Sequence, residues 1–185
     1  MTNAQIASLL RNVAAAYAIK NEAKYRFQII AYEKAADSIE GTTQQLKDLY
    51  KEGKLENIPG VGPSIRQHLE DLFKTGTVKH FDWVMSDIPK AVFPLLSIPS
   101  FGPKKAFKLV SEFKLKNPET VLDDLEKIAK ANKISTLEGF GEKSQSDILR
   151  AIGEFRLGKG KTTRMALPFA SELAQKILEY LKKSS

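Results

Sequence analysis

The feature that most constrains the fold of this chain is a short motif that occurs three times at nearly constant spacing. Residues 58–62 (IPGVG), 98–102 (IPSFG) and 137–141 (LEGFG) share the order apolar, any, small, apolar, glycine. They begin 40 and then 39 residues apart, which indicates a repeated structural unit. Apolar residues at three- and four-residue spacing follow each motif, as in an amphipathic helix. The repeat therefore predicts units made of a helix, a tight glycine turn and a second helix.

Helical periodicity also fills the first part of the chain. Apolar residues recur at helical spacing from Ile6 to Tyr17 and from Phe27 to Ile39. This pattern predicts two amphipathic helices with buried apolar faces, Phe27 and Ile30 included. No segment of comparable length alternates with period two. We therefore predict an all-α fold.

Capping signals and proline positions divide the chain further. We expect Thr43 to cap a third helix and Gly53 to end it. Pro63 and Pro103 stand at first helical positions, where the missing N–H of proline costs nothing. We predict tandem helix-hairpin-helix lobes: residues 1–85 with the first turn, residues 86–157 with the second and third turns, and residues 158–185 as a basic linker with a C-terminal helix.

The composition favours an anionic partner and excludes several kinds of site. The net charge is +7, and the excess lies in residues 156–185, which hold 7 basic and 2 acidic residues. With no cysteine and only two histidines, His68 and His80, disulfides, thiolate zinc sites and all-histidine metal centres are excluded. The apolar runs are too short to cross a bilayer. We expect an intracellular protein, cytoplasmic and nucleoid-associated in a prokaryote or nuclear in a eukaryote.

The repeated turn suits the binding of a phosphate. Glycine permits positive φ and lets the backbone approach a ligand without a Cβ in the way. The helix that follows points its free N–H groups and its positive dipole end at an anion there. Lys104 and Lys105 stand in the first turn of such a helix, where the dipole disfavours cations. These two lysines make sense if an anion docks at the second turn.

A structural interpretation competes with this one at several positions. A Gly-x-Gly before a helix is often only a turn or a cap. The third turn is flanked by Glu138, Glu142 and Asp147, so it could equally serve the architecture alone. We expect His68 to be solvated and Trp83 to belong to the core.

Several segments together resemble the N-terminal part of family X DNA polymerases, the group that contains DNA polymerase beta and bacterial and archaeal enzymes. They are residues 32–36 (YEKAA), 58–76 (IPGVGPSIRQHLEDLFKTG), 98–106 (IPSFGPKKA), 139–143 (GFGEK) and 166–170 (ALPFA). The resemblance covers nearly the whole chain, and its combined order is specific. It implies a small helical domain that engages the 5′ side of a DNA gap, followed by a fingers-like region that holds duplex.

This resemblance and the turn motifs together assign a set of binding residues. No cofactor is required, but the resemblance implies that a Na⁺ or K⁺ ion bridges the turns and phosphate through the carbonyls of Glu56, Ile58, Val61, Leu96, Ile98 and Phe101. The predicted DNA-binding residues are Gly60, Val61, Gly62, Ser64, Arg66, Ser100, Gly102, Lys104, Lys105, Lys108, Gly139, Gly141, Lys143 and Tyr32, with Lys161 and Arg164 of the basic tail.

The chain departs from the family where chemistry is concerned. The family's palm carries an Asp-x-Asp motif for two divalent ions, and no such motif occurs in these 185 residues. The lysine of the family's lyase reaction falls on His68, and imidazole cannot form a stable imine. Other basic residues of the 5′-phosphate pocket fall on Gln28, Glu56 and Ser64, although Tyr32 matches. We therefore expect neither activity from this chain alone, with Lys34 and Lys74 as weak substitutes for the lysine.

The predicted function is sequence-independent DNA binding through backbone phosphates, as the DNA-gripping part of a family X DNA polymerase acting in repair. We expect gapped, nicked or duplex DNA as the partner, no membrane, and a palm domain in the full-length protein. Two alternatives stay open. One is a stand-alone helix-hairpin-helix protein that serves as a repair scaffold, and the other is a residual abasic-site lyase.

Overall fold

The computed structural model describes residues 1–158, and every regular element within this range is helical. The predicted all-α fold with tandem helix-hairpin-helix units is therefore confirmed. The elements are α1 (Asn3–Asn21), α2 (Arg26–Gly41), α3 (Leu46–Lys51), the 3-10 helix η1 (Leu55–Asn57), α4 (Pro63–Thr75), α5 (Lys79–Met85), α6 (Val92–Leu95), α7 (Pro103–Glu112), α8 (Val121–Lys130) and α9 (Glu142–Arg156).

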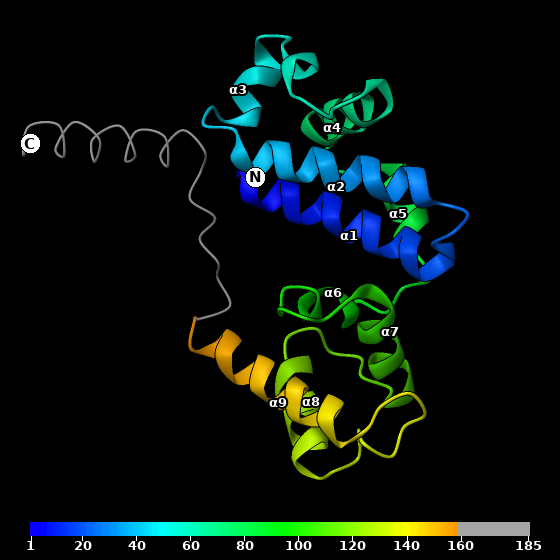
Figure 1. Cartoon of the computed structure of the whole chain (residues 1–185). Helices are drawn as coiled ribbons and strands as arrows, with labels where there is room; N and C mark the ends of the chain where they lie inside the picture. Colours follow the sequence, from blue (N-terminus) through cyan, green and yellow to red (C-terminus); the bar gives the residue numbers. More distant parts are fainter. Residues whose placement is uncertain (159–185) are drawn as a thin grey trace, which may run out of the picture.

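Helices α1 to α5 form an N-terminal lobe, in which the two longest helices, α1 and α2, run antiparallel side by side (Figure 1). The start of α1 is fixed by a capping box. The Thr2 hydroxyl accepts a hydrogen bond from the Gln5 backbone N–H at 3.3 Å, and the Gln5 side chain accepts one from the Thr2 N–H at 2.8 Å. Both bonds satisfy amides that have no partner within the helix.

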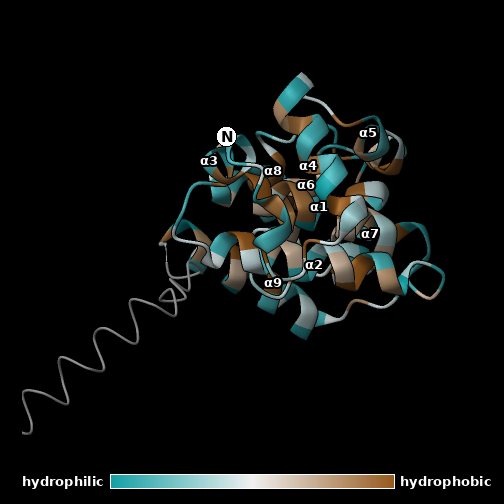
Figure 2. Cartoon of the chain, turned by 90° about the horizontal axis from the view of Figure 1, so that it is seen from above, coloured by the Kyte–Doolittle hydropathy of each residue, from teal (hydrophilic) through white to brown (hydrophobic). Residues whose placement is uncertain are grey.

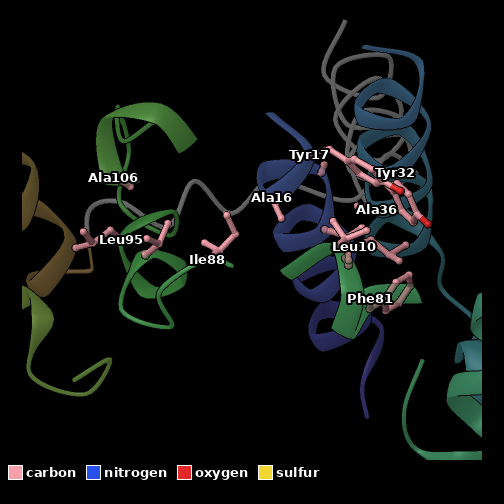
Figure 3. Packing of buried hydrophobic residues seen from close by; sticks show 14 of the residues in the cluster. Leu10, Ala16, Tyr17, Tyr32, Ala36, Phe81, Ile88, Leu95 and Ala106 are labelled. Atoms are coloured by element: carbon pink, nitrogen blue, oxygen red, sulfur yellow. The ribbon is translucent and has the colours of Figure 1, made fainter. Parts of the chain in front are cut away.

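Helices α6 to α9 form a second lobe, which meets the N-terminal lobe where α1 approaches α7 (Figure 1). The buried apolar side chains of both lobes belong to one contiguous cluster. Figure 3 shows Leu10, Tyr17 and Phe81 in its N-terminal part and Leu95 in its second part. Figure 2 shows hydrophilic residues predominantly on the outer faces of the helices. The domain limits given above stay predictions.

Helix α2 corrects one expectation about the core. Its buried residues are Tyr32, Ala35, Ala36 and Ile39, and one turn earlier this stripe continues at the partly buried Ile29 rather than at position 27 or 30. Phe27 is consequently 84% exposed, and Ile30 is exposed as well. The prediction that both side chains are buried is wrong, because α2 packs against the lobe along one narrow face.

Two other local expectations need correction. Gln45, not Thr43, precedes the first residue of α3, and no side chain caps that helix. Trp83 is 56% exposed, because the buried face of α5 is formed by Phe81 and Val84. The remaining signals were correct: Gly53 adopts φ +67° just after α3, and the two helices that follow the first and second turns begin at Pro63 and Pro103.

Asn3 connects the start of α1 to the segment between α2 and α3. Its side-chain amide donates hydrogen bonds to the Thr42 and Gln44 carbonyls at 3.2 and 2.9 Å, and its oxygen accepts one from the Leu46 N–H at 2.8 Å. All its hydrogen-bonding groups are thus satisfied although the residue is buried. A single polar side chain holds this loop in place.

Replacing Asn3 tests this connection. Asn3→Ala is expected to lower the free energy of unfolding by about 2 to 3 kcal/mol, because it leaves buried backbone groups without partners. Urea unfolding followed by circular dichroism measures the change. The exposed Asn57 provides a matched control, and Asn57→Ala should change stability by less than about 0.5 kcal/mol. Equal effects of the two substitutions would contradict the assigned role of Asn3.

Candidate nucleic-acid interface

The three sequence motifs fold into the same turn. In each, the backbone N–H of the fourth residue donates to the carbonyl of the first: Val61 to Ile58 at 3.1 Å, Phe101 to Ile98 at 3.2 Å and Phe140 to Leu137 at 2.9 Å. The third residue has positive φ in every case, +79° at Gly60, +72° at Ser100 and +80° at Gly139. A left-handed third residue defines a type II turn, and proline favours its second position. The repeat in sequence is a repeat in backbone geometry.

Each turn is anchored in the core by its fourth residue. Val61 and Phe101 are buried and Phe140 is half-buried. The glycine that follows is the N-cap of α4, α7 or α9, and no side chain caps any of these three helices. Their first amides therefore have no partner within the helix and lie where the positive end of the dipole meets solvent. Each turn presents an uncapped helix start.

The glycine at the fifth position of each motif is not required by the backbone. Gly62, Gly102 and Gly141 have φ values that any residue adopts, and a Cβ added there would meet nothing within 4 Å. The positive φ that the sequence analysis attributed to the whole motif belongs only to its third residue. At the fifth position of each motif, the absence of a side chain leaves open space in front of the helix amides. This space is what a close-approaching backbone ligand needs.

The predicted basic residues of the first two turns are held by carboxylates of the same chain. Arg66 pairs with Glu56 at 2.7 Å, and Lys104 pairs with Glu22 at 2.7 Å across the two lobes. The Lys104 ammonium lowers the pKa of the Glu22 carboxyl through a hydrogen bond and its charge. Glu56, Lys104 and Glu22 are largely exposed and Arg66 is half-buried, and ion pairs this accessible to solvent contribute little to stability. A phosphate could therefore replace either carboxylate at low cost.

Lys105 and Lys108 lie against aromatic rings of the turns. The Lys105 ammonium lies 5.0 Å from the centroid of the Phe101 ring, and burial lowers its pKa. The Lys108 ammonium donates to the Glu138 carbonyl at 2.6 Å and lies 5.9 Å from the centroid of the Phe140 ring. Lys108, on the helix after the second turn, thus contacts the third turn directly. The two turns of the second lobe are connected through this side chain.

The third turn has features of its own. Lys143 is exposed, but Glu142 also stands in the first turn of α9 and competes for the helix start. The segment before the turn is held by buried Gln145, whose oxygen accepts from the Ile134 and Ser135 N–H groups at 3.1 and 3.0 Å. Gln145 was not among the residues predicted from the sequence. The signal was a polar residue three positions before Ile148 on the buried face of an amphipathic helix.

The position at which the resemblance places the family's lyase lysine is occupied by His68. His68 accepts or donates a hydrogen bond with the Tyr32 hydroxyl, the atoms lying 2.9 Å apart. Burial lowers the pKa of His68, and the charge of His80 lowers it further. The expectation that His68 is solvated is wrong, because α2 and α5 cover it. Ser64 is exposed at the helix start, and Lys74 pairs with Glu70 at 3.8 Å.

The predicted cation ligands are neutral carbonyls, the oxygen donors that hard cations prefer. Pro59 and Pro99 have no N–H, so the Glu56 and Leu96 carbonyls lack the partner that residue i+3 would supply. None of the loop hydrogen bonds in residues 1–158 ends on either oxygen. In the same range, no group of three or more His, Cys, Asp or Glu residues could hold a metal ion. The carbonyls are compatible with an alkali cation in chemical type.

Two of the predicted DNA contacts belong to the basic tail. The predicted contacts Lys161 and Arg164 lie outside the described residues. Within residues 1–158 no helix combines the length and the apolar character that spanning a membrane requires.

Comparisons with known proteins agree with this geometry. Residues 1–78 match the family described as helix-hairpin-helix domain. The chain is 27% identical over 183 residues to the DNA polymerase/3′-5′ exonuclease PolX of Bacillus subtilis. The aligned region covers 99% of this chain and 30% of that protein. It is also 31% identical over 104 residues to the cytoplasmic leucine–tRNA ligase of Arabidopsis thaliana. That aligned region covers 56% of this chain and 9% of the ligase.

These matches confirm the resemblance to family X DNA polymerases and support DNA binding by the helix-hairpin-helix units. The chain spans less than a third of the length of PolX. The similarity to the tRNA ligase involves a much smaller share of that protein and carries no further argument.

The left-handed residue of each turn allows a test of the turn geometry. Gly60→Ala is expected to destabilise the protein by about 1 to 2 kcal/mol, the cost of a left-handed L-residue. The added Cβ would also lie 3.5 Å from the Lys34 backbone. Ser100→Gly removes the same strain and is expected to stabilise by up to about 1 kcal/mol. Thermal unfolding by calorimetry measures both changes, and effects of the same sign would refute the shared geometry.

Proposed function

We propose that this helix-hairpin-helix chain, a relative of family X DNA polymerases, binds DNA by its sugar-phosphate backbone without reading the base sequence. The observation that carries the proposal is the turn that occurs three times, each time followed by a helix whose first amides are uncapped and whose N-cap glycine leaves space for a ligand. Backbone amides at a helix start bind a phosphate oxygen equally well whatever base is attached. Affinity would therefore depend on salt far more than on sequence.

The first two turns are the better phosphate sites in this proposal. Neither α4 nor α7 has an acidic residue in its first turn, whereas α9 has Glu142. At the second turn, a phosphate at the amides of α7 would draw Lys104 from Glu22, exchanging one exposed ion pair for another. The third turn would serve mainly to hold the second lobe together through Lys108.

The finer assignment concerns the kind of DNA and the larger protein. We propose that the N-terminal lobe engages the 5′ side of a gap or nick and that the second lobe holds adjacent duplex, as part of a DNA repair polymerase. The similarity to PolX over both lobes supports this assignment. A palm with its metal-binding carboxylates would then belong to the full-length protein.

A bound Na⁺ or K⁺ at the first two turns is a further part of the proposal. Glu56 and Val61 in the first turn and Leu96 and Phe101 in the second would supply carbonyl oxygens, together with Ile58 and Ile98. The ion would add a positive charge beside the phosphate without a side chain. The carbonyls left free by Pro59 and Pro99 support this arrangement.

Lyase activity is the alternative that a specific residue argues against. The neutral His68 imidazole cannot replace a lysine amine in Schiff-base formation. Borohydride trapping on DNA with an abasic site is expected to give no covalent adduct with the purified chain. A strong adduct that disappears in Lys34→Ala or Lys74→Ala would establish a residual lyase instead.

The open glycines provide a test that separates binding from folding. In Gly62→Ser with Gly102→Ser, each hydroxyl can cap the free amides, which should stabilise the protein by roughly a few tenths of a kcal/mol per helix. The same hydroxyls occupy the phosphate sites, so DNA affinity should fall about tenfold per turn, the size of one charge-assisted hydrogen bond. Fluorescence anisotropy with labelled gapped and duplex DNA measures the affinity.

Gly153→Ala is the matched control, because Gly153 lies within α9 and its Cβ would also meet nothing within 4 Å. It should stabilise by about 1 kcal/mol and leave DNA affinity unchanged. In salt titrations, the slope of log affinity against log salt concentration should be smaller in magnitude by about 1 to 2 in the double variant than in the parent chain. This difference is expected for the loss of one or two phosphate contacts. Unchanged affinity and slope in the double variant would leave the scaffold alternative in place.

A further inference from the structure

The N-terminal lobe holds the only two histidines of the chain as a stacked pair. His68 on α4 and His80 on α5 have ring centroids 4.6 Å apart and planes inclined by 10°. Each ring also shares a hydrogen bond with the hydroxyl of a buried tyrosine. The hydroxyl oxygen of Tyr32 on α2 lies 2.9 Å from Nδ1 of His68, and that of Tyr17 on α1 lies 2.7 Å from Nε2 of His80.

The charged groups around the pair do not neutralise an imidazolium. Among the described residues, no carboxylate is hydrogen-bonded to either ring. Asp71, on the same helix as His68, favours the charged form only through its distant charge. From α1, the Lys20 ammonium lies 5.6 Å from the Trp83 ring, which neighbours His80. From α2, the uncharged hydroxyl of Tyr32 is hydrogen-bonded to His68.

This environment keeps both rings neutral in the free protein. Burial lowers the pKa of His80 and is the largest cause of the lowered pKa of His68. Two imidazolium rings at this separation would repel each other, so the pair can accept one proton readily but not two. Because the folded pKa lies below the unfolded value near 6.5, the free protein should lose stability as the pH falls through that value.

The pair lies close to the first turn. His68 follows the N-cap Gly62 by six positions, which is about 9 Å along the axis, and helical side chains lean towards the helix start. Its partner Tyr32 is two residues from Lys34, whose backbone lies 3.5 Å from a Cβ built on Gly60. A phosphate at the start of α4 would thus stand within about one Debye length of the pair.

We propose that the stacked pair is a proton-binding site coupled to DNA binding at the first turn. The phosphate stabilises one imidazolium of the pair, so that binding raises the fraction of the pair that carries a proton taken from the solvent on a histidine nitrogen. DNA affinity consequently rises as the pH falls. This inference rests on the proposed function, because it requires a DNA phosphate at the start of α4.

Affinity measurements across pH test the coupling. At constant ionic strength, the affinity of the full chain for labelled gapped DNA should rise about three- to tenfold between about pH 8 and about pH 6, as expected for charges roughly 8 Å apart near a surface. In His68→Phe with His80→Phe, which keeps the aromatic stack, this rise should vanish. A rise of the same size in both proteins would overturn the proposal, since the proton would then bind elsewhere.

A second measurement needs no substitution. Calorimetric titration of the parent chain with the same DNA, in two buffers of different ionisation enthalpy near pH 6.5, should report uptake of a fraction of one proton per complex. No proton uptake upon binding would overturn the coupling while leaving DNA binding intact. Absence of binding at every pH would overturn the proposed function and the coupling together.

Trp83 provides an internal reporter that distinguishes these failures. It is the only tryptophan of the chain, and its ring lies 5.8 Å from that of His80. Its fluorescence should titrate with the pair below about pH 6.5 in the free protein, and at a higher pH when DNA is bound. An identical midpoint with and without bound DNA would refute the coupling.

Discussion

The structure depends on one backbone constraint, the left-handed third residue of each turn. That residue reverses the chain within four positions and sets the next residue into the core, so that the following helix starts at the surface. Because the same conformation occurs at positions 60, 100 and 139, three helices begin in the same way. The fold thereby produces three equivalent surface features from one local rule. Side chains then distinguish the three, through Lys104 at the second turn and Glu142 at the third.

The fold was predictable where local chemistry decides it. The turns, the helix starts at Pro63 and Pro103 and the all-helical class follow from glycine, proline and periodicity, which act over a few residues. The expectations for Phe27 and Trp83 failed for a different reason. Periodicity shows that a helix has an apolar stripe, but the width of the face that is covered depends on which other helices pack there. That arrangement is a property of the tertiary structure.

The candidate site was predictable in its backbone and less so in its charges. Sequence placed Lys104, Lys105 and Lys108 beside the second turn, but the ion-pair or hydrogen-bond partners of Lys104 and Lys108 come from distant segments. Glu22 lies in another lobe and Glu138 in another turn, and no local pattern announces either contact. The same limit applies to His68, whose neighbours Tyr32 and His80 come from two other helices. Long-range pairing of polar groups therefore determines how the local sites behave.

The three uncapped helix starts also imply a trade-off in the evolution of this chain. A serine or aspartate at each N-cap would add roughly a few tenths of a kcal/mol of stability over glycine, and the extended backbone at Gly62, Gly102 and Gly141 would accept it. Natural proteins commonly forgo such gains where function needs the unsatisfied group. In this chain, the small stabilisation that a capping side chain would give is missing at the three positions where a ligand could supply the hydrogen bonds instead.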